Sequence, residues 1–445
     1  MLYILLFFVL ILLGLSYRRN KSFLFVPSIM CIASFVIGLI FLSIKIDYLG
    51  YKISIETVFF ILFGLSSVFL GEYITKVSSY LSKRELSIRK SWLNIIEFRI
   101  NKKISVVLFI INCIVTYLFS KEIIRIAFLA ELTSLGNFSE IMASYRTAMM
   151  FGDSINFNIS PVVSQLQKIV TISSYLYLFV FIANVTKGMK LKSNIMNIIV
   201  VLPYFVITYL SGGRIGFIKI LIAILLFIYI CCFLEFEKRK FIYFFSKFKI
   251  YVILSFVGIL LVFYSLRIAL GRLSSEDAKF SDYITMYIGV PILNFDLYLK
   301  DNKSYSFNIS KSETFNGISV FINKLEGDKV NIGLPFKYTK RGESLGNVYT
   351  SFRRYHHDFG IFGVFMMPFL MSFILSKILN IAFFKSYNSK SFSFLIILYG
   401  YLYAALPTYA AEDIFFIRLN IGFIEEILLL YIMNRYLIKS IYAFK

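Results

Sequence analysis

Acidic side chains are scarce in this chain. It has 25 Asp and Glu against 47 Lys and Arg, a formal net charge of +22 over 445 residues. Only 16% of the residues are charged, whereas about a quarter are charged in a typical soluble domain. A basic chain could bind nucleic acid, but its bases lie in short segments between long apolar runs, so membrane orientation explains them better. The composition excludes an ordinary soluble domain, and we expect no nucleic-acid partner.

Residues that mark metal, redox and nucleotide sites are also few. The chain has two histidines and four cysteines, and every cysteine lies inside an apolar run without zinc or disulfide spacing. It contains no Asp-x-Asp triplet, and no acidic cluster is spaced like a metal site. We therefore expect no metal and no cofactor. A P-loop and a glycine-rich dinucleotide fingerprint are both missing, which argues against an ATP-driven pump.

What the sequence has in abundance is apolar length. Hydrophobic residues make up 58% of the chain, and the mean hydropathy is +0.77. Several runs reach the roughly 20 residues that a helix needs to cross a bilayer. We predict an all-α polytopic membrane protein that forms one integral membrane domain over residues 1–445. Its eleven expected spans are 1–17, 22–44, 54–72, 104–120, 161–185, 195–211, 214–234, 249–267, 359–383, 392–408 and 414–434.

The positions of Lys and Arg predict how the chain crosses the membrane. Basic residues cluster after the odd-numbered spans, at 18–21, 76–103, 187–192, 238–249, 385–390 and 435–445. Short cytoplasmic loops are rich in Lys and Arg, so this alternation places the N-terminus outside and the C-terminus in the cytoplasm. One missed span would break the alternation, which supports the count of eleven.

Residues 268–358 form the largest predicted external segment, directly before the ninth span. Within it, 283–300 is apolar but interrupted by Gly289, Pro291, Asn294 and Asp296. That stretch is too short and too broken to span, so we interpret it as an interfacial or re-entrant amphipathic helix. Residues 301–346 are rich in Asn, Ser, Lys and Gly and are predicted to be an exposed loop. Long loops in compact proteins are usually functional or disordered.

Arginines on the predicted external side are the first candidate site residues. Short loops on that side normally carry few bases, so several arginines there suggest a shared anionic partner. Arg binds phosphate through a planar fork of donors and suits a diphosphate. Snorkelling toward lipid headgroups is the alternative for each of them, above all for Arg272 and Arg418. The candidates for anion binding are Arg214, which follows two glycines, and Arg267, Arg272, Arg353 and Arg354.

Both histidines lie side by side, at the predicted start of the ninth span. His356 and His357 are followed by Asp358. Neighbouring helical residues point about 100° apart, so these two histidines would chelate one metal poorly. A neutral imidazole suits proton transfer from a hydroxyl, and Asp358 could orient it or bind sugar. A structural role remains an alternative for each histidine.

Three further residues are weaker candidates for contact with sugar. Tyr355 belongs to a set of tyrosines near the predicted outer boundaries, where an interfacial belt and stacking against sugar rings are both plausible. Glu412 and Asp413 lie between the tenth and eleventh spans. A solvated turn is the plainer explanation of these two carboxylates.

Three stretches resemble the Wzy-type O-antigen and oligosaccharide repeat-unit polymerases. They are TYLSGGRIGFIKILIAI (208–224), YIGVPILNFDLYL (287–299) and YHHDFGIFGVFMMPFL (355–370). Members of that family have about ten to fourteen spans and one large external loop late in the chain. The resemblance covers the architecture of residues 195–435, and it depends on the order and placement of the three short motifs.

The resemblance implies a glycosyltransferase with a C-type membrane fold in a bacterial inner membrane. The active site would face the periplasm, and the substrate would be an oligosaccharide repeat unit on undecaprenyl diphosphate. The enzyme would move the growing glycan from its lipid onto the non-reducing end of a new lipid-linked unit, inverting the anomeric centre without metal. Arginines would bind the diphosphate, and Gly360 and Gly363 would allow close packing behind the site. A polysaccharide chain-length regulator and membrane lipid are the implied partners.

Two other functions stay open at this level. An O-antigen ligase shares the architecture but uses lipid A core as the acceptor, and its pattern would place Asn, Ser or Gln after the histidine, where Asp358 stands here. A flippase or transporter for the lipid-linked unit would carry charges through a central cavity between pseudo-symmetric halves. The candidate residues here gather at one predicted face, which favours the polymerase.

Overall fold

The protein is described by a computed structural model, which gives the structure of residues 1–21, 23–75, 91–130, 138–151, 157–213, 215–236, 280–301, 307–326, 333–385 and 389–442. Its chain divides into two compact units. The first contains Met1–Glu85, Ser275–Asn380 and Ala405–Ile421, and the second contains Leu86–Ser274, Ile381–Ala404 and Gly422–Lys445. The predicted eighth span, together with Arg214, Arg267 and Arg272, lies outside the described residues.

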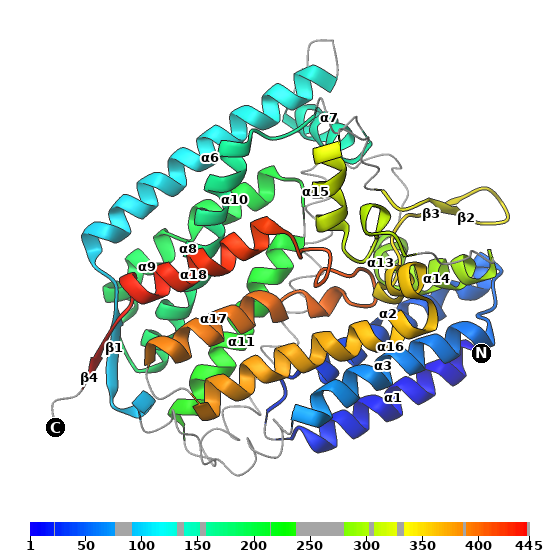
Figure 1. Ribbon diagram of the computed structural model, residues 1–445, viewed down its shortest axis with the longest axis horizontal. Coiled ribbons are helices and arrows are strands. Elements are labelled where there is room, and N and C mark those ends of the chain that lie inside the picture. The colour runs from blue at the N-terminus through cyan, green and yellow to red at the C-terminus, as the bar shows by residue number, and fades with distance from the viewer. Residues whose placement is uncertain are drawn as a thin grey trace. The chain divides into compact units, whose positions relative to one another are not determined.

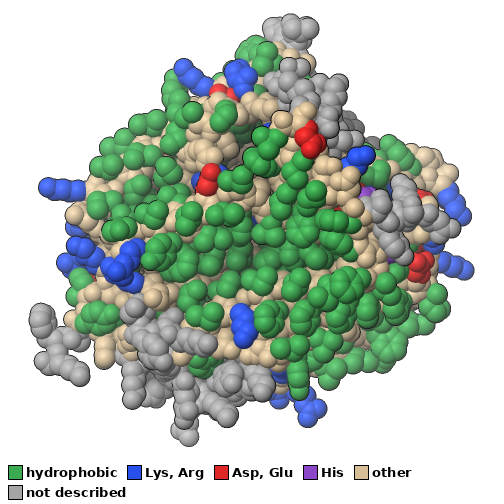
Figure 2. Space-filling model, in the orientation of Figure 1, with side chains coloured by type: hydrophobic (Ala, Val, Ile, Leu, Met, Phe, Trp, Pro, Cys, Tyr) green, Lys and Arg blue, Asp and Glu red, His purple; other side chains and the backbone are tan. Residues whose placement is uncertain are grey.

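Across the described ranges, nine helical segments are long and apolar enough to cross a membrane. They confirm a multi-pass helical membrane protein. Apolar side chains cover most of the helical surface visible in Figure 2, as expected where lipid is the solvent. The segments are Leu2–Arg19, Pro27–Leu49, Ile55–Thr75, Lys102–Ala130, Pro161–Thr186, Leu191–Leu210, Ile215–Glu235, Ser351–Phe384 and Ser389–Thr408.

The first unit is built on four long helices. They are α1 (Leu2–Arg19), α2 (Pro27–Leu49), α3 (Ile55–Thr75) and α16 (Ser351–Asn380). Figure 1 shows α1, α3 and α16 running side by side. Glu72 on α3 is buried, and it accepts hydrogen bonds from Asn20 Nδ2 at 2.7 Å and from the backbone N–H of Ser28 at 3.1 Å. These bonds fix the turn between α1 and α2 against α3.

Six shorter elements of the first unit precede α16 in the chain, and one, η4, follows it. They are α13 (Phe280–Ile288), α14 (Val290–Lys300), η2 (Ile309–Lys311), α15 (Asn316–Glu326), β2 (Lys337–Tyr338), β3 (Ser344–Gly346) and η4 (Leu406–Thr408). Strands β2 and β3 form an antiparallel hairpin. The predicted exposed loop at 301–346 therefore contains a helix and a hairpin. The predicted amphipathic segment at 283–300 is two helices that meet at Gly289, and α14 is buried against α2, α3 and α16.

Two polar residues explain how α14 is held inside the protein. The carboxylate of Asp296 accepts hydrogen bonds from the backbone N–H of Ser54 at 2.7 Å and from Thr57 Oγ1 at 2.8 Å, at the start of α3. The amide of Asn294 donates to the carbonyl groups of Leu345 at 3.1 Å and Val348 at 2.9 Å, just before α16. A buried polar group needs such partners, and here the partners fix the entrances of two spanning helices.

The second unit contains the other long helices. They are α6 (Lys102–Ala130), α8 (Pro161–Thr186), α11 (Ile215–Glu235), α17 (Ser389–Tyr403) and α18 (Ile421–Leu437). Shorter elements are β1 (Ile95–Arg99), α7 (Phe138–Phe151), η1 (Leu191–Asn194), α9 (Ile195–Ile199), α10 (Leu202–Leu210), η3 (Ile381–Lys385) and β4 (Lys439–Tyr442). Strand β1 pairs antiparallel with β4, which brings residue 95 opposite residue 442.

Among the described spans, the ninth and the eleventh begin furthest from the expected residues, and the second begins at Pro27 where 22 was expected. The ninth was expected at 359–383, but α16 already starts at Ser351 and changes direction at Gly360. The eleventh was expected at 414–434, but α18 starts at Ile421 and has only 17 residues. There the carboxylate of Asp413 accepts the backbone N–H groups of Phe415 and Phe416, which folds the chain into a turn before the helix.

Candidate functional site

The polar candidates of the 355–370 stretch lie on the first turns of α16, ahead of the bend. Ser351 begins the helix, and its hydroxyl donates to the carbonyl of Tyr409 at 2.7 Å. Gly360 interrupts the helix with φ 60° and ψ −146°, a conformation that a residue with a Cβ atom rarely adopts. A Cβ atom on Gly363 would lie 2.2 Å from the carbonyl oxygen of Tyr355. Glycine at both positions therefore lets the polar segment pack closely against the apolar span.

Arg353 is held by two aromatic rings and one carboxylate. Its guanidinium lies 5.0 Å from the ring centre of Tyr298 and 4.8 Å from that of Tyr349, and it forms an ion pair with Glu313. The side chain is only 2% exposed. Desolvated cation–π contacts stabilise such a charge, and the carboxylate neutralises it. Arg353 keeps one buried donor, Nε, without a hydrogen-bond partner in the described part of the chain.

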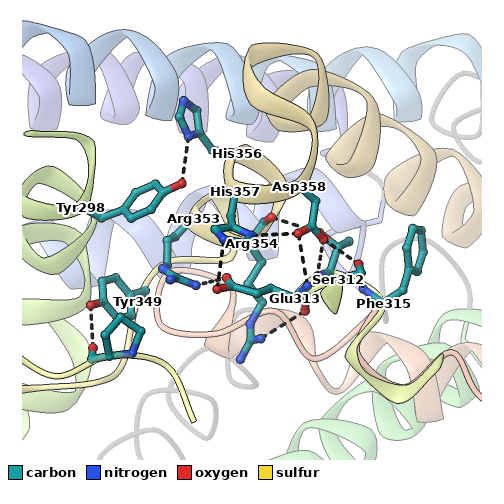
Figure 3. A network of polar contacts seen from close by, with 12 residues as sticks. Tyr298, Ser312, Glu313, Phe315, Tyr349, Arg353, Arg354, His356, His357 and Asp358 are labelled. Carbon is teal, nitrogen blue, oxygen red and sulfur yellow. Dashed lines mark hydrogen bonds and ion pairs between the residues drawn. The ribbon is translucent and has the colours of Figure 1, made fainter. Parts of the chain in front are cut away.

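Asp358 joins α16 to the segment that precedes α15. Its carboxylate accepts hydrogen bonds from Ser312 Oγ at 2.7 Å, from the N–H of Thr314 at 2.8 Å and from the N–H of Glu313 at 3.2 Å. The same carboxylate lies 3.0 Å from His357 Nδ1. Four polar contacts satisfy this buried acid and fix residues 312–314 on the helix, as Figure 3 shows.

His357 is the more exposed of the two histidines. An ionised carboxylate only accepts hydrogen bonds, so we assign the proton of neutral His357 to Nδ1, which donates to Asp358. The lone pair is then on Nε2, which lies 3.7 Å from Glu313 Oε1, and the side chain is 32% exposed. A partly exposed imidazole that is oriented by one carboxylate through Nδ1 is arranged to accept a proton at Nε2.

His356 has a different environment. Its ring packs edge-on against Phe60, with ring centres 4.9 Å apart, and is buried. Its Nδ1 lies 3.3 Å from the hydroxyl of Tyr298. Burial raises the pKa of Tyr298 to about 12, so that hydroxyl keeps its proton at neutral pH and can donate it to the imidazole. The contacts of His356 fit packing and hydrogen bonding inside the unit, and in Figure 3 the two histidines point to different sides.

Arg354 and Asp413 are two further charged residues of the site, and both are buried. The guanidinium of Arg354 donates to the carbonyl of Glu313 at 3.1 Å. Asp413 is fully buried, and burial raises its pKa to about 6 although the charge of Arg354 acts in the opposite direction. Tyr355 is fully buried beside it. Neither Tyr355 nor Asp413 can contact a sugar without displacement of the residues that bury them, whereas Glu412 is partly exposed.

Glu313 is the site residue that the sequence did not indicate. It lies 40 residues before Arg353, in a stretch predicted to be an exposed loop. The only local signal is the Ser-Glu-Thr sequence ahead of α15, and nothing in it identifies the partner. Of the predicted residues, the structure brings together Arg353, Arg354, His357 and Asp358. Arg214, Arg267 and Arg272 lie outside the described residues, although Gly212, just before Arg214, has the positive φ of 65° expected of a glycine turn.

In the portion of the chain that the structure describes, no group of three or more His, Cys, Asp or Glu side chains is arranged to hold a metal ion. The chemistry that the described residues can carry out themselves is proton transfer at His357 and anion binding by arginine. No protein-family model, curated protein or solved structure matches the chain.

Proposed function

We propose that this protein is a glycosyltransferase that polymerises oligosaccharide repeat units carried on undecaprenyl diphosphate. The observation that supports this most is the partly exposed His357, which is oriented by Asp358 and has two arginines on the same helical turns. The motif resemblance to repeat-unit polymerases points to the same reaction. In this proposal the chain lies in a bacterial inner membrane, with the N-terminus outside, the C-terminus in the cytoplasm and the site facing the periplasm.

The proposed reaction needs one proton acceptor and one stabilised leaving group. A hydroxyl at the non-reducing end of the new repeat unit gives its proton to His357 Nε2, and its oxygen forms a bond to the anomeric carbon of the growing glycan. The bond from that carbon to the diphosphate breaks, and the electron pair leaves with the lipid diphosphate. Asp358 stabilises the imidazolium that forms. The attack inverts the anomeric centre, and the new proton leaves with the product or the solvent.

Arginines supply the stabilisation of the leaving group in this proposal. Arg353 pairs with the side-chain carboxylate of Glu313, and Arg354 donates to the backbone carbonyl of the same residue. A diphosphate could therefore take the place that the Glu313 carboxylate occupies, and the buried Nε of Arg353 offers a further donor. Preorganised donors of this kind contribute about 3–4 kcal/mol each to stabilisation of a transition state. Arg214, Arg267 and Arg272 are proposed as additional diphosphate ligands.

The proposal is tested by reconstitution of the purified protein in liposomes with a lipid-diphosphate-linked repeat unit as the sole substrate. A ladder of glycans spaced by one repeat unit on a gel is the expected result, and protein-free liposomes are the control. Movement of the substrate across the bilayer without a ladder would instead identify a transporter. Transfer to added lipid A core, without self-polymerisation, would identify a ligase.

A further inference from the structure

Within the described part of the chain, helix α15 carries an apolar face on which two side chains are exposed and two are half-buried. Ile318, Phe321, Ile322 and Leu325 recur at the helical spacing of three and four residues, so they share one face. Phe321 is 41% exposed and Leu325 is 74% exposed. On a soluble protein the apolar stripe of a helix is the side that faces the core.

The polar face of α15 makes hydrogen bonds to the rest of the first unit. Ser319 Oγ and Asn323 Nδ2 both donate to the carbonyl of Ser310, the second at 2.8 Å. The N–H of Gly317 donates to the carbonyl of Ile417 at 3.1 Å. These bonds anchor the first turns of α15 through its polar side and hold the opposite side outward. The helix is thus inverted relative to an ordinary amphipathic surface helix.

The outward face is continuous with the apolar surface of a spanning helix. Phe307 is exposed, and its ring stacks on Phe359 with ring centres 4.8 Å apart. Phe359 is followed on α16 by Ile361 and Phe362, which are also exposed. Phe315, directly before α15, packs edge-on against the same Phe359 ring. Aromatic contacts therefore connect the lipid-facing side of α16 to the start of α15.

The direction and charge of α15 suit the boundary between lipid and water. In Figure 1 the axis of α15 runs across the direction of α3 and α16, and Figure 2 shows apolar side chains at its position. Exposed Lys311 and Lys324 lie before and near the end of the helix, against one exposed acid within it, Glu326. Lysine stems cover apolar surface while the amino groups reach headgroup phosphates.

We propose that α15 lies on the bilayer surface as an interfacial helix. Ile318, Phe321, Ile322 and Leu325 insert at the level where headgroups meet acyl chains, and the two lysines bind lipid phosphate. This inference does not depend on the proposed enzymatic activity. It has a local consequence, because Glu313 lies only three residues before the start of α15. A helix fixed on the membrane would hold the carboxylate of Glu313 against Arg353.

The proposal is tested with a fluorescent label on the outward face. Leu325→Cys is made together with Cys113→Ser, since Cys113 is exposed and the other three cysteines are buried. The purified full-length variant is labelled with nitrobenzoxadiazole and reconstituted into phosphatidylcholine vesicles with and without phosphatidylglycerol. The matched control is Glu343→Cys on the exposed connection between β2 and β3. Lipids with a nitroxide near the glycerol end of the acyl chain, and aqueous iodide, serve as the two quenchers.

The label at residue 325 should lose most of its fluorescence to the nitroxide lipid and little to iodide, whereas the label at residue 343 should do the reverse. Lys324→Glu should weaken lipid quenching of the 325 label in vesicles that contain phosphatidylglycerol. Strong quenching of the 325 label by iodide, with none by nitroxide lipid, would refute the proposal. Protection from iodide that appears only at several protein copies per vesicle would also refute it and would assign the face to contact between copies.

Discussion

Both units contain a buried cation held between a carboxylate and an aromatic ring. In the first unit, Arg353 lies between two tyrosine rings and pairs with Glu313. In the second, Lys187 Nζ lies 4.6 Å from the ring centre of Trp92 and 3.1 Å from a carboxylate oxygen of Glu235. The two cations are almost equally buried, at 2% and 3% exposure of the side chain.

The two clusters differ in what surrounds the pair. The indole N–H of Trp92 donates to Glu235 at 3.0 Å, and Lys187 donates to the backbone carbonyl of Trp92 at 2.9 Å. The three residues are therefore hydrogen-bonded to one another. In the first unit the carboxylate of Glu313 also faces a partly exposed imidazole, that of His357. A buried ion pair is therefore weak evidence for function. The partly exposed imidazole of His357 beside the ion pair is what distinguishes the candidate site in the first unit from the cluster in the second.

Replacement of His357 is expected to have the largest effect of the changes considered, and that effect is on the rate of polymer synthesis. His357→Gln removes the proposed proton acceptor, so the rate of polymer synthesis in liposomes should fall by about 10²–10⁴-fold. The melting temperature should change little, because the side chain is partly exposed. The matched control is His356→Gln, which removes a buried ring. Its main effect should be a lower melting temperature and not a lower rate of polymer synthesis. Polymer synthesis at the wild-type rate by His357→Gln would remove this residue from the mechanism.

Loss of the Glu313 or the Glu235 carboxylate should lower the stability of the protein by a similar amount, but only loss of Glu313 should change activity. Glu313→Gln and Glu235→Gln each leave a buried cation without its ion-pair partner, so each should lower the free energy of unfolding by about 3 kcal/mol. Unfolding titrations in detergent measure this loss. In the proposed reaction the substrate diphosphate competes with Glu313, so Glu313→Gln should also lower the KM for lipid-linked substrate. Glu235→Gln should leave the KM unchanged, and an equal change in both variants would contradict the distinction.

An effect of similar size on stability, confined to a range of pH, is expected from Asp413. Burial raises its folded pKa to about 6, above the ordinary value of 3.8, so the fold favours the neutral acid. Its contribution to stability is complete below about pH 4 and is lost as the pH rises through 6. Relative to Asp413→Asn, wild-type protein should lose about 3 kcal/mol of unfolding free energy over that range and none above it. Melting curves at several pH values test this, and a difference that is constant with pH would be the contrary result.

Much of the fold follows from apolar length alone. A run such as 161–185 predicts a helix because a bilayer leaves the backbone no other hydrogen-bond partners, and α8 covers Pro161–Thr186. The start of α16 was placed too late because its first turns are polar. Pairing of β1 with β4 could not be predicted, since Ile95 and Tyr442 are distant in sequence and neither strand has a distinctive alternating pattern.

Only the site residues that lie on α16 could be predicted from the sequence. Adjacent Arg, His and Asp residues at the start of an apolar run were a clear signal for His357 and Asp358. Glu313 was missed because its position depends on hydrogen bonds from residues 312–314 to Asp358, which no local pattern encodes. The burial of Arg353 between Tyr298 and Tyr349 depends on the same long-range packing.

Helix α14 also limits how the length of this chain can change. Successive residues of an α-helix are rotated by about 100°, so Asn294 and Asp296 project from nearly opposite sides of α14. One side holds the approach to α16, and the other holds the start of α3. A substitution at either position releases one attachment, and a single-residue insertion between them rotates one attachment by about 100° relative to the other, so that both can no longer form together. Insertions and deletions within α14 should therefore be far rarer among descendants of this sequence than within the hairpin of β2 and β3.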